Sequence, residues 1–471
     1  MRTSTSEPRG QVVVIVAVAF TVMLALLAVL FDGANGMVTR REMQDAGDAA
    51  AISASNLIQV GSPRGCSATP GGAPRAAVAQ AARDSLAANL EWFDASTAVI
   101  TCPAGYENQA IAIELGATSA RFFGGMVGGD IQVNTRSAAV NRVITGSRYS
   151  IVQLDPGHQS WPNGQRGCPS VLLSGGPTVI LQATMQVNST CTAANGGALS
   201  TNGSGGSLTM TNGAPIRVVG GYSAGSMSIT PAPTTGVAAI PDPLAKLPPV
   251  DVANTPLIRS TRLVLSNTTQ VLQPGRYQGG IELRNSSVAL LLPGIYVIQG
   301  GGLQIGAQAS VLSVRAGVTT PGANWGNDCP ANACGVMIYN TTGATALGQL
   351  SVAAGSTLRL RAYDPDAVPG GGVADFENIL VWQDANPVPT STYAQPIVQL
   401  NGGGNVDIRG TVYAPSAKVE MGGNSGGSGG DAVNLTLQFI SWDLEFRGNS
   451  AFTFFFNDEE FARPIDYGLV E

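Results

Sequence analysis

The sequence predicts one transmembrane helix at the N-terminus, then a small α+β domain, then a large all-β domain. An uncharged apolar run lies at 12–31. Helix-like and strand-like patterns follow it as far as residue 148. From residue 149 to 471, short β-branched runs recur among Gly, Ser, Thr and Asn, with a proline-rich stretch at 230–256. The domain boundaries are therefore expected at 1–36, 37–148 and 149–471.

Composition excludes several classes of protein. Only 12% of residues are charged, against about 25% in ordinary soluble domains. The net charge of −6 argues against a nucleic-acid partner, because phosphate binding needs a basic face. A single histidine, His158, rules out multi-histidine metal sites. We predict no catalytic residue and no cofactor.

The uncharged run Val12–Phe31 predicts the membrane anchor. As a helix it spans about 30 Å, the thickness of the hydrocarbon core of a bilayer. It is longer than the apolar core of a signal peptide, and no Ala-x-Ala cleavage site follows it. Arg2 and Arg9 precede it while Arg40 and Arg41 follow, so charge favours a cytoplasmic N-terminus only slightly.

The six cysteines all lie after the apolar run, which places the bulk of the chain outside the cytoplasm because disulfides need an oxidising compartment. Their even number and local spacing predict three disulfides, although six cysteines permit 15 connectivities. A metal site is the weaker alternative, since no C-x-x-C spacing occurs. The nearest-neighbour pairs are Cys66 with Cys102, Cys168 with Cys191, and Cys329 with Cys334.

The predicted α+β domain begins with a helix that continues from the membrane. Apolar spacing predicts this helix over Met37–Val60, and Gly33 and Gly36 predict a bend before it. Pro74 precedes a second predicted helix. This second helix is expected at 75–92. It is followed by expected strands at 98–102 and 110–115, a short helix at 121–126 and a strand from 131.

The N-terminus resembles a known family. RGQ at 9–11, Asp32 after the apolar run and RREMQDAGDAAAISAS at 40–55 are similar to the TadG group of TadE/TadG-like proteins, which are associated with the tight-adherence (Flp) pilus. The resemblance extends over roughly residues 9–145 and implies other Tad pilus proteins as partners. Gly10 is in the place of a prepilin cleavage site, but the fifth residue after it is Ile15 rather than glutamate, which favours retention in the membrane.

A near-repeat predicts the architecture of residues 149–471. Pro274-Gly275-Arg276-Tyr277 and the following GGIEL are similar to Pro293-Gly294-Ile295-Tyr296 and the following GGLQI. A period of about 20 residues with short strands and tight corners favours a right-handed parallel β-helix. The alternative is a β-sandwich, whose turns recur every 8–12 residues. The proline-rich stretch 230–256 is expected to cross the domain in an extended form.

Two patterns of chemical interest have ordinary explanations. Gly221–Gly225 (GYSAG) matches the nucleophile elbow, but no helix-forming sequence follows it and His158 lies upstream, so we interpret it as a chance match. Four carboxylates between residues 364 and 377 suggest a calcium loop or an acid/base pair, against a solvated loop as the alternative. These candidate ligands are Asp364, Asp366, Asp375 and Glu377.

Aromatic residues and the acidic C-terminus complete the candidates. Tryptophans can stack on sugar rings, but isolated ones are more often buried in a core; they are Trp161, Trp325, Trp382 and Trp442. The acidic residues near the C-terminus are expected to lie in a solvated tail; they are Asp458, Glu459, Glu460, Asp466 and Glu471.

The sequence thus predicts a non-enzymatic, single-pass cell-membrane protein whose partners are the membrane and other Tad pilus proteins. It would act as a pilus-assembly accessory or a cell-surface adhesion component. The alternative is a cell-envelope protein that binds or cleaves polysaccharide, with a cell-surface glycan as its partner.

Overall fold

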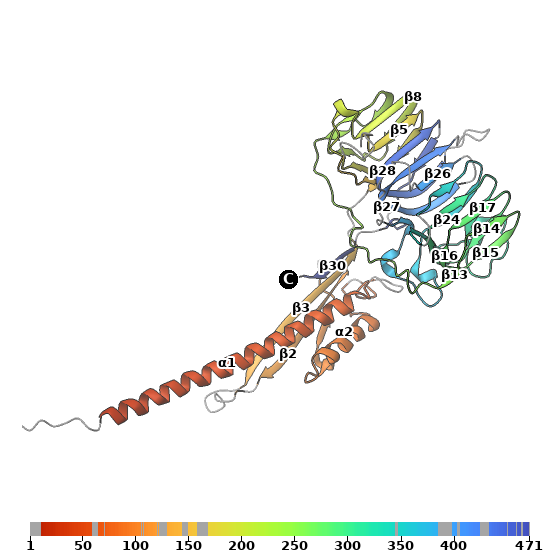
Figure 1. Cartoon of the computed structure of the whole chain (residues 1–471). Coiled ribbons are helices and arrows are strands. Elements are labelled where there is room, and N and C mark those ends of the chain that lie inside the picture. Colours follow the sequence, from red (N-terminus) through yellow and green to blue (C-terminus); the bar gives the residue numbers. More distant parts are fainter. Residues whose placement is uncertain are drawn as a thin grey trace, which may run out of the picture. The chain divides into compact units, whose positions relative to one another are not determined.

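The computed structural model describes residues 11–58, 65–69, 71–104, 106, 108–119, 121, 130–143, 149–157, 168–343, 347–384, 398–402, 406–423, 433–449, 451–457, 459–462 and 465–470. The chain forms two compact units (Figure 1). Unit 1 contains Met1–Val143 together with Ile465–Glu471, and unit 2 contains Ile144–Pro464. Unit 2 is therefore an insertion into the sequence of unit 1.

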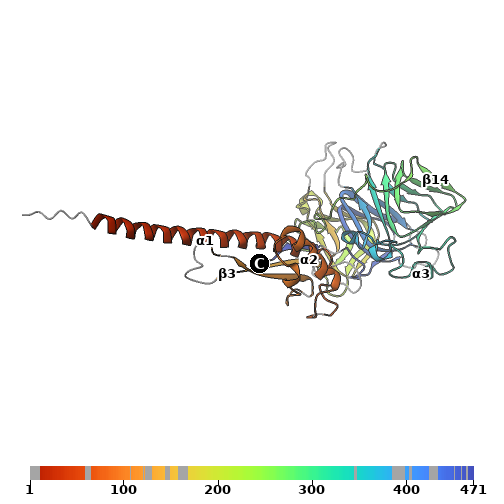
Figure 2. The same ribbon diagram turned by 90° about the horizontal axis from the view of Figure 1, so that it is seen from below.

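Unit 1 consists of two helices and one antiparallel sheet (Figure 2). The strand order is β1-β2-β3-β30, and every pairing described in this sheet is antiparallel. Buried residues of both helices and of β2 and β3 form its core. The elements are α1 (Gln11–Ser55), α2 (Ala76–Asn89), a 3₁₀ turn (Ala95–Thr97), β1 (Val99–Thr101), β2 (Ala110–Ser119), β3 (Ile131–Val143) and β30 (Ile465–Leu469).

Helix α1 departs from the sequence prediction at two points. It runs unbroken through Gly33 and Gly36, so the predicted bend at these glycines is wrong. Intrahelical hydrogen bonds tolerate isolated glycines, at a cost of about 1 kcal/mol each. The helix ends at Ser55 rather than at Val60. Most of the short helix expected at 121–126 lies outside the described residues.

The last strand of the chain belongs to unit 1. Strand β30 pairs antiparallel with β3, from Ile465 opposite Val143 to Leu469 opposite Ala139. The sequence predicts a solvated acidic tail within the β-rich domain, whereas Asp466 lies within this strand of unit 1. Asp458 and Glu471 lie outside the described residues. The alternating pattern IDYGL is the sequence signal for the strand.

Unit 2 is built from short strands, and all the strand pairings described in it are parallel. This differs from a β-sandwich, whose sheets are antiparallel. Its first strands are β4 (Tyr149–Gln153), β5 (Val171–Gly175), β6 (Thr178–Leu181), β7 (Thr184–Val187), β8 (Leu199–Met210), β9 (Ile216–Val218), β10 (Tyr222–Ser223), β11 (Ser226–Thr230) and β12 (Thr234–Thr235).

The strands that follow the proline-rich stretch continue in the same manner. They are β13 (Leu257–Arg259), β14 (Leu263–Ser266), β15 (Thr269–Leu272), β16 (Gly275–Gln278), β17 (Ile281–Arg284), β18 (Val288–Leu291), β19 (Gly294–Gln299), β20 (Leu303–Ile305), β21 (Ser310–Ser313), β22 (Val336–Thr341), β23 (Leu350–Val352), β24 (Thr357–Arg361), β25 (Ile379–Gln383), β26 (Val398–Gly402), β27 (Val406–Gly423), β28 (Val433–Gly448) and β29 (Ala451–Phe454). Helical turns interrupt them at α3 (Trp325–Asp328), Pro365–Ala367 and Ala374–Phe376, and an earlier turn lies at Ala193–Asn195.

Each strand from β13 to β21 pairs with the strand three places further along the chain. Leu263 lies opposite Ile281, and Ile281 in turn lies opposite Leu303. The offset widens between β19 and β22, because an insertion at 314–335 follows β21. The near-repeat in the sequence thus corresponds to the spacing of successive paired strands.

The order of the strands in space differs from their order in the chain. Strand β28 pairs with β4 and β5, and β29 pairs with β6. Strands β13–β15 form one end of the stack and β10–β12 the other. Residues 236–256 connect these ends: Asn188, just after β7, bonds to Ile240, and Arg276 in β16 bonds to Val252.

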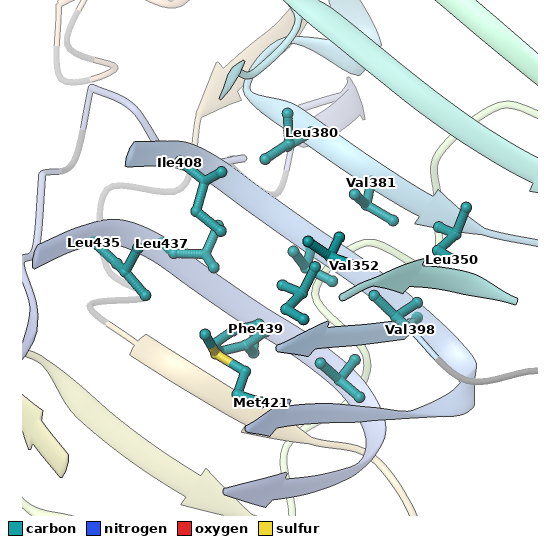
Figure 3. Close-up of a cluster of buried hydrophobic side chains, with 14 of the residues drawn as sticks. Leu350, Val352, Leu380, Val381, Val398, Ile408, Met421, Leu435, Leu437 and Phe439 are labelled. Carbon is teal, nitrogen blue, oxygen red and sulfur yellow. The ribbon is translucent and has the colours of Figure 1, made fainter. Parts of the chain in front are cut away.

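Apolar side chains from successive strands fill the interior of unit 2. Figure 3 shows Leu350, Val398, Ile408, Leu437 and Phe439 from neighbouring strands lying together in this core. The near-repeat also has a structural reason. Both repeat tyrosines are buried, and each donates its hydroxyl hydrogen bond to the carbonyl four residues earlier, Tyr277 to Gln273 and Tyr296 to Leu292. Their rings stack with centroids 6.1 Å apart.

Two segments cover outward-facing side chains of unit 2. The 236–256 segment packs Leu244 and Val250 against a row that includes Tyr339, Trp382 and Tyr413. In this layer Tyr413 donates a hydrogen bond of 2.7 Å to Asp242, and burial raises the pKa of that carboxyl. Elsewhere, the 314–335 insertion packs Trp325 and the Cys329–Cys334 disulfide against Leu290 and Leu312.

Candidate membrane anchor

The first half of α1 is apolar and exposed on all sides. Its large side chains from Val13 to Phe31 are solvent-accessible and contact no core. By length and composition this helix can cross a membrane. At 1.5 Å per residue, residues 12–31 extend about 30 Å of the helix's total of about 67 Å. So large an exposed apolar surface is unfavourable in water, so we expect lipid or another protein to cover it.

The helix changes character at Asp32. The Asp32 side chain is buried, although the residues just before it are exposed. Further along the helix, the Asn35 amide donates a hydrogen bond of 3.0 Å to the hydroxyl of Ser119 at the end of β2. These polar residues begin the part of α1 that packs on the sheet.

Gln44 joins the helix to β3, and Asp48 holds the Gln44 side chain in place. The Gln44 amide donates to the Asp48 carboxylate at 2.8 Å and to the Ser137 hydroxyl at 3.1 Å. Between them, Gly47 permits close approach, because a Cβ at this position would lie 2.7 Å from the Ser137 hydroxyl oxygen. Asp45 is exposed and forms an ion pair of 4.0 Å with Arg41.

The alanine run completes the contact with the sheet. Small side chains at helical spacing lie buried against β2, β3 and α2, where larger ones would hold the elements apart. The buried alanines of this stripe are Ala46, Ala50, Ala51 and Ala54, and the larger Met43 precedes them. The alanine run therefore gives α1 a surface of small side chains, which lets the helix pack closely on the sheet.

Arg75 closes the C-terminal end of α1. Its guanidinium donates to the carbonyl of Leu57, to that of Ile58 at 3.2 Å and to that of Gly65 at 2.6 Å. Carbonyls beyond a helix end have no partner within the helix. Burial lowers the pKa of Arg75, but a guanidinium remains charged. The sequence does not single out Arg75, because its partners are backbone atoms.

The six cysteines form the three expected local disulfides. Cys66–Cys102 lies in unit 1, with a Cα–Cα distance of 5.8 Å. Unit 2 holds Cys168–Cys191 at 6.0 Å and Cys329–Cys334 at 5.3 Å. The first bond ties the segment after α1 to the end of β1.

The structure does not bring the calcium candidates together. Among the described residues, no group of three or more His, Cys, Asp or Glu side chains is placed to hold a metal ion. Asp364 instead accepts a hydrogen bond from the Asp366 backbone at 2.9 Å and caps a 3₁₀ turn. Asp375 lies within the turn Ala374–Phe376, and Glu377 follows that turn directly. The described structure therefore gives no support to a calcium site at Asp364, Asp366, Asp375 and Glu377, and the calcium interpretation stays a prediction.

The other candidates also lie in structural positions. Ser223 of the GYSAG match belongs to the short strand β10, which leads to β11 and not to a helix. His158 and Trp161 lie outside the described residues. Trp325 and Trp382 are buried in packed clusters and offer no open face to a sugar.

These features define a protein with one long N-terminal helix, exposed and apolar over its first half and packed on a small sheet over its second. Residues 10–65 match the Tad family model, whose description reads "Putative Flp pilus-assembly TadE/G-like". The N-terminal region is thus TadE/G-like, as its residues predict. The match ends well before residue 145. No curated protein and no solved structure matches the chain.

Proposed function

We propose that this protein is a single-pass, membrane-anchored accessory of the Flp/Tad pilus. Residues 12–31 would lie in the bilayer, and the packed part of unit 1 would begin at the bilayer surface with Asp32. The observation that carries the proposal is the division of α1: the large side chains of its apolar half are exposed, while its TadE/G-like half is packed in the core of unit 1. One continuous helix would therefore couple the membrane to the folded part of the chain.

We infer that the N-terminus is cytoplasmic and that both folded units lie outside the cytoplasm. The disulfides in both units support this orientation, because cytosolic thiols are kept reduced. The charges that flank the apolar run add little in either direction.

Unit 2, in our interpretation, is a right-handed parallel β-helix that presents a surface and performs no catalysis. The parallel pairing of each strand with the third one along supports the β-helix. The turn-capping role of Asp364 and the burial of Trp325 and Trp382 support a role other than polysaccharide binding or cleavage.

The test is deletion of the gene, with surface pili counted by electron microscopy. The full chain should restore the pili that the deletion removes. A chain with residues 1–31 replaced by a cleavable signal peptide should be exported but should not restore them. A matched chain with residues 12–31 replaced by an unrelated apolar helix of equal length separates anchoring from recognition of this segment. Unchanged pili after the deletion would contradict the proposal.

A further inference from the structure

One end of unit 2 has open strand edges. Strands β13, β14 and β15 each pair on one side only among the described residues, with β16, β17 and β18 respectively. We call residues 257–272, which contain these three strands, the edge coil. The free backbone groups of an edge strand are a template for another extended chain.

The edge coil also exposes apolar side chains. Unit 2 has five exposed large hydrophobic residues among those described, and three of them lie here: Leu257 (48% exposed), Ile258 (37%) and Val264 (44%). The coil is nevertheless ordered from within, because Leu263 and Leu265 point into the core and are buried. These apolar side chains are therefore presented outward by a packed scaffold.

The opposite end of the stack also has strands that pair on one side only among the described residues, β10, β11 and β12, but it lacks the exposed apolar side chains. Strand β12 has only two residues, and Pro231 and Pro233 precede it. None of the described residues from 184 to 235 is an exposed large hydrophobic side chain. Short strands and prolines are the usual protection of a sheet edge. Because only the edge coil exposes apolar side chains, the two ends do not complement each other, which favours a different partner over stacking of copies end to end.

Charge defines the chemistry of that partner. The edge coil contains Arg259 and Arg262 and no acidic residue. Arg262 contacts Glu282 at 3.1 Å, whereas Arg259 is exposed and makes no ion pair with any described residue. A partner strand that carries carboxylates would complement this charge.

We propose that the edge coil binds an extended, acidic strand of another polypeptide by strand addition. Apolar side chains of the bound strand would cover Leu257, Ile258 and Val264, and its Asp or Glu side chains would face Arg259. This inference goes beyond the proposed pilus function and does not depend on it.

A library of random peptides displayed on phage tests the proposal against the purified full chain in detergent. Selected peptides should combine alternating apolar residues with Asp or Glu. They should bind at least about tenfold more weakly to Val264→Lys, which replaces an apolar contact of the edge with a charge. Val373→Lys is the matched control, because Val373 is also 44% exposed in unit 2 and belongs to the turn at Ala374–Phe376 and not to the edge coil. Its binding should equal that of the wild type.

Arg259→Glu provides a second variant at an exposed position, where folding is not at risk. It should weaken binding of acidic peptides by at least about tenfold and favour basic ones. Three outcomes would overturn the proposal: no peptide enriched on the wild type, equal binding to Val264→Lys with normal circular dichroism, or peptides without acidic residues. Disulfide cross-linking of two copies through Leu257→Cys would overturn it in favour of a second copy.

Discussion

The two halves of α1 share one helical geometry but have opposite surroundings. Residues 13–31 are mostly branched and apolar, and their large side chains are exposed, whereas residues 32–55 combine charged and small side chains and pack on β2, β3 and α2. Backbone hydrogen bonds are satisfied within the helix in both halves, so neither half needs the other to remain helical. The comparison shows that the uncovered and the packed parts of one helix differ in the composition of their side chains.

The largest expected effect concerns the apolar half. Leu24→Arg combined with Leu27→Arg should remove the protein from the membrane fraction, because each arginine near the helix centre costs about 2.5–3.5 kcal/mol of insertion free energy. Fractionation of membranes after a high-salt wash measures this loss. Val38→Arg, an exposed position in the packed half, should leave the protein in the membrane.

A smaller effect is expected from the disulfide beside the packed half. Cys66→Ser with Cys102→Ser should lower the free energy of unfolding of unit 1 by about 4 kcal/mol, since the bond joins cysteines at a sequence separation of 36. Removal of Cys329–Cys334, with a separation of only 5, should cost about 2 kcal/mol in unit 2. Urea unfolding in detergent measures both. Neither variant changes the apolar half of α1, so both should stay in the membrane. Release of either variant would contradict the claim that residues 12–31 alone anchor the protein.

Two glycines of α1 form a matched pair for the next prediction. Gly47→Leu should destabilise unit 1 by about 1–3 kcal/mol, because its side chain would meet Ser137 and Leu115. Gly33→Leu should stabilise the helix slightly, because no atom lies within 4 Å of its Cβ position and leucine is the better helix former. Thermal unfolding followed by circular dichroism distinguishes them. Equal effects at the two positions would contradict the packing described for β3.

The smallest effect belongs to the exposed ion pair. Arg41→Ala or Asp45→Ala should change the stability of unit 1 by less than about 0.5 kcal/mol, since both side chains are mostly in water. Urea unfolding again gives the measurement, and a loss above about 1 kcal/mol would mean that the pair contacts something else. In that case the charged residues Arg41 and Asp45 of the segment 40–55 would bind a partner.

Sequence periodicity predicted the elements whose pattern is local. The apolar run, the second helix and the strands around Ile281 and Leu303 follow directly from residue spacing. The pairing of β30 with β3 could not be predicted, because the whole of unit 2 lies between these strands in the chain. The calcium candidates illustrate the opposite case. Neighbouring carboxylates in a turn-rich segment cap turns at least as readily as they bind metal, and composition does not distinguish the two.

Chemical labelling of cysteines that replace two matched valines tests most directly whether only the apolar half of α1 lies in the membrane. Val18 and Val38 are 59% and 56% exposed in the protein itself, so only a membrane can make them differ. The native cysteines are all in disulfides, so Val18→Cys and Val38→Cys each add a single reactive thiol. In isolated membranes a charged maleimide should modify Val38→Cys rapidly, and Val18→Cys only after solubilisation. Equal modification of both in intact membranes would contradict the account.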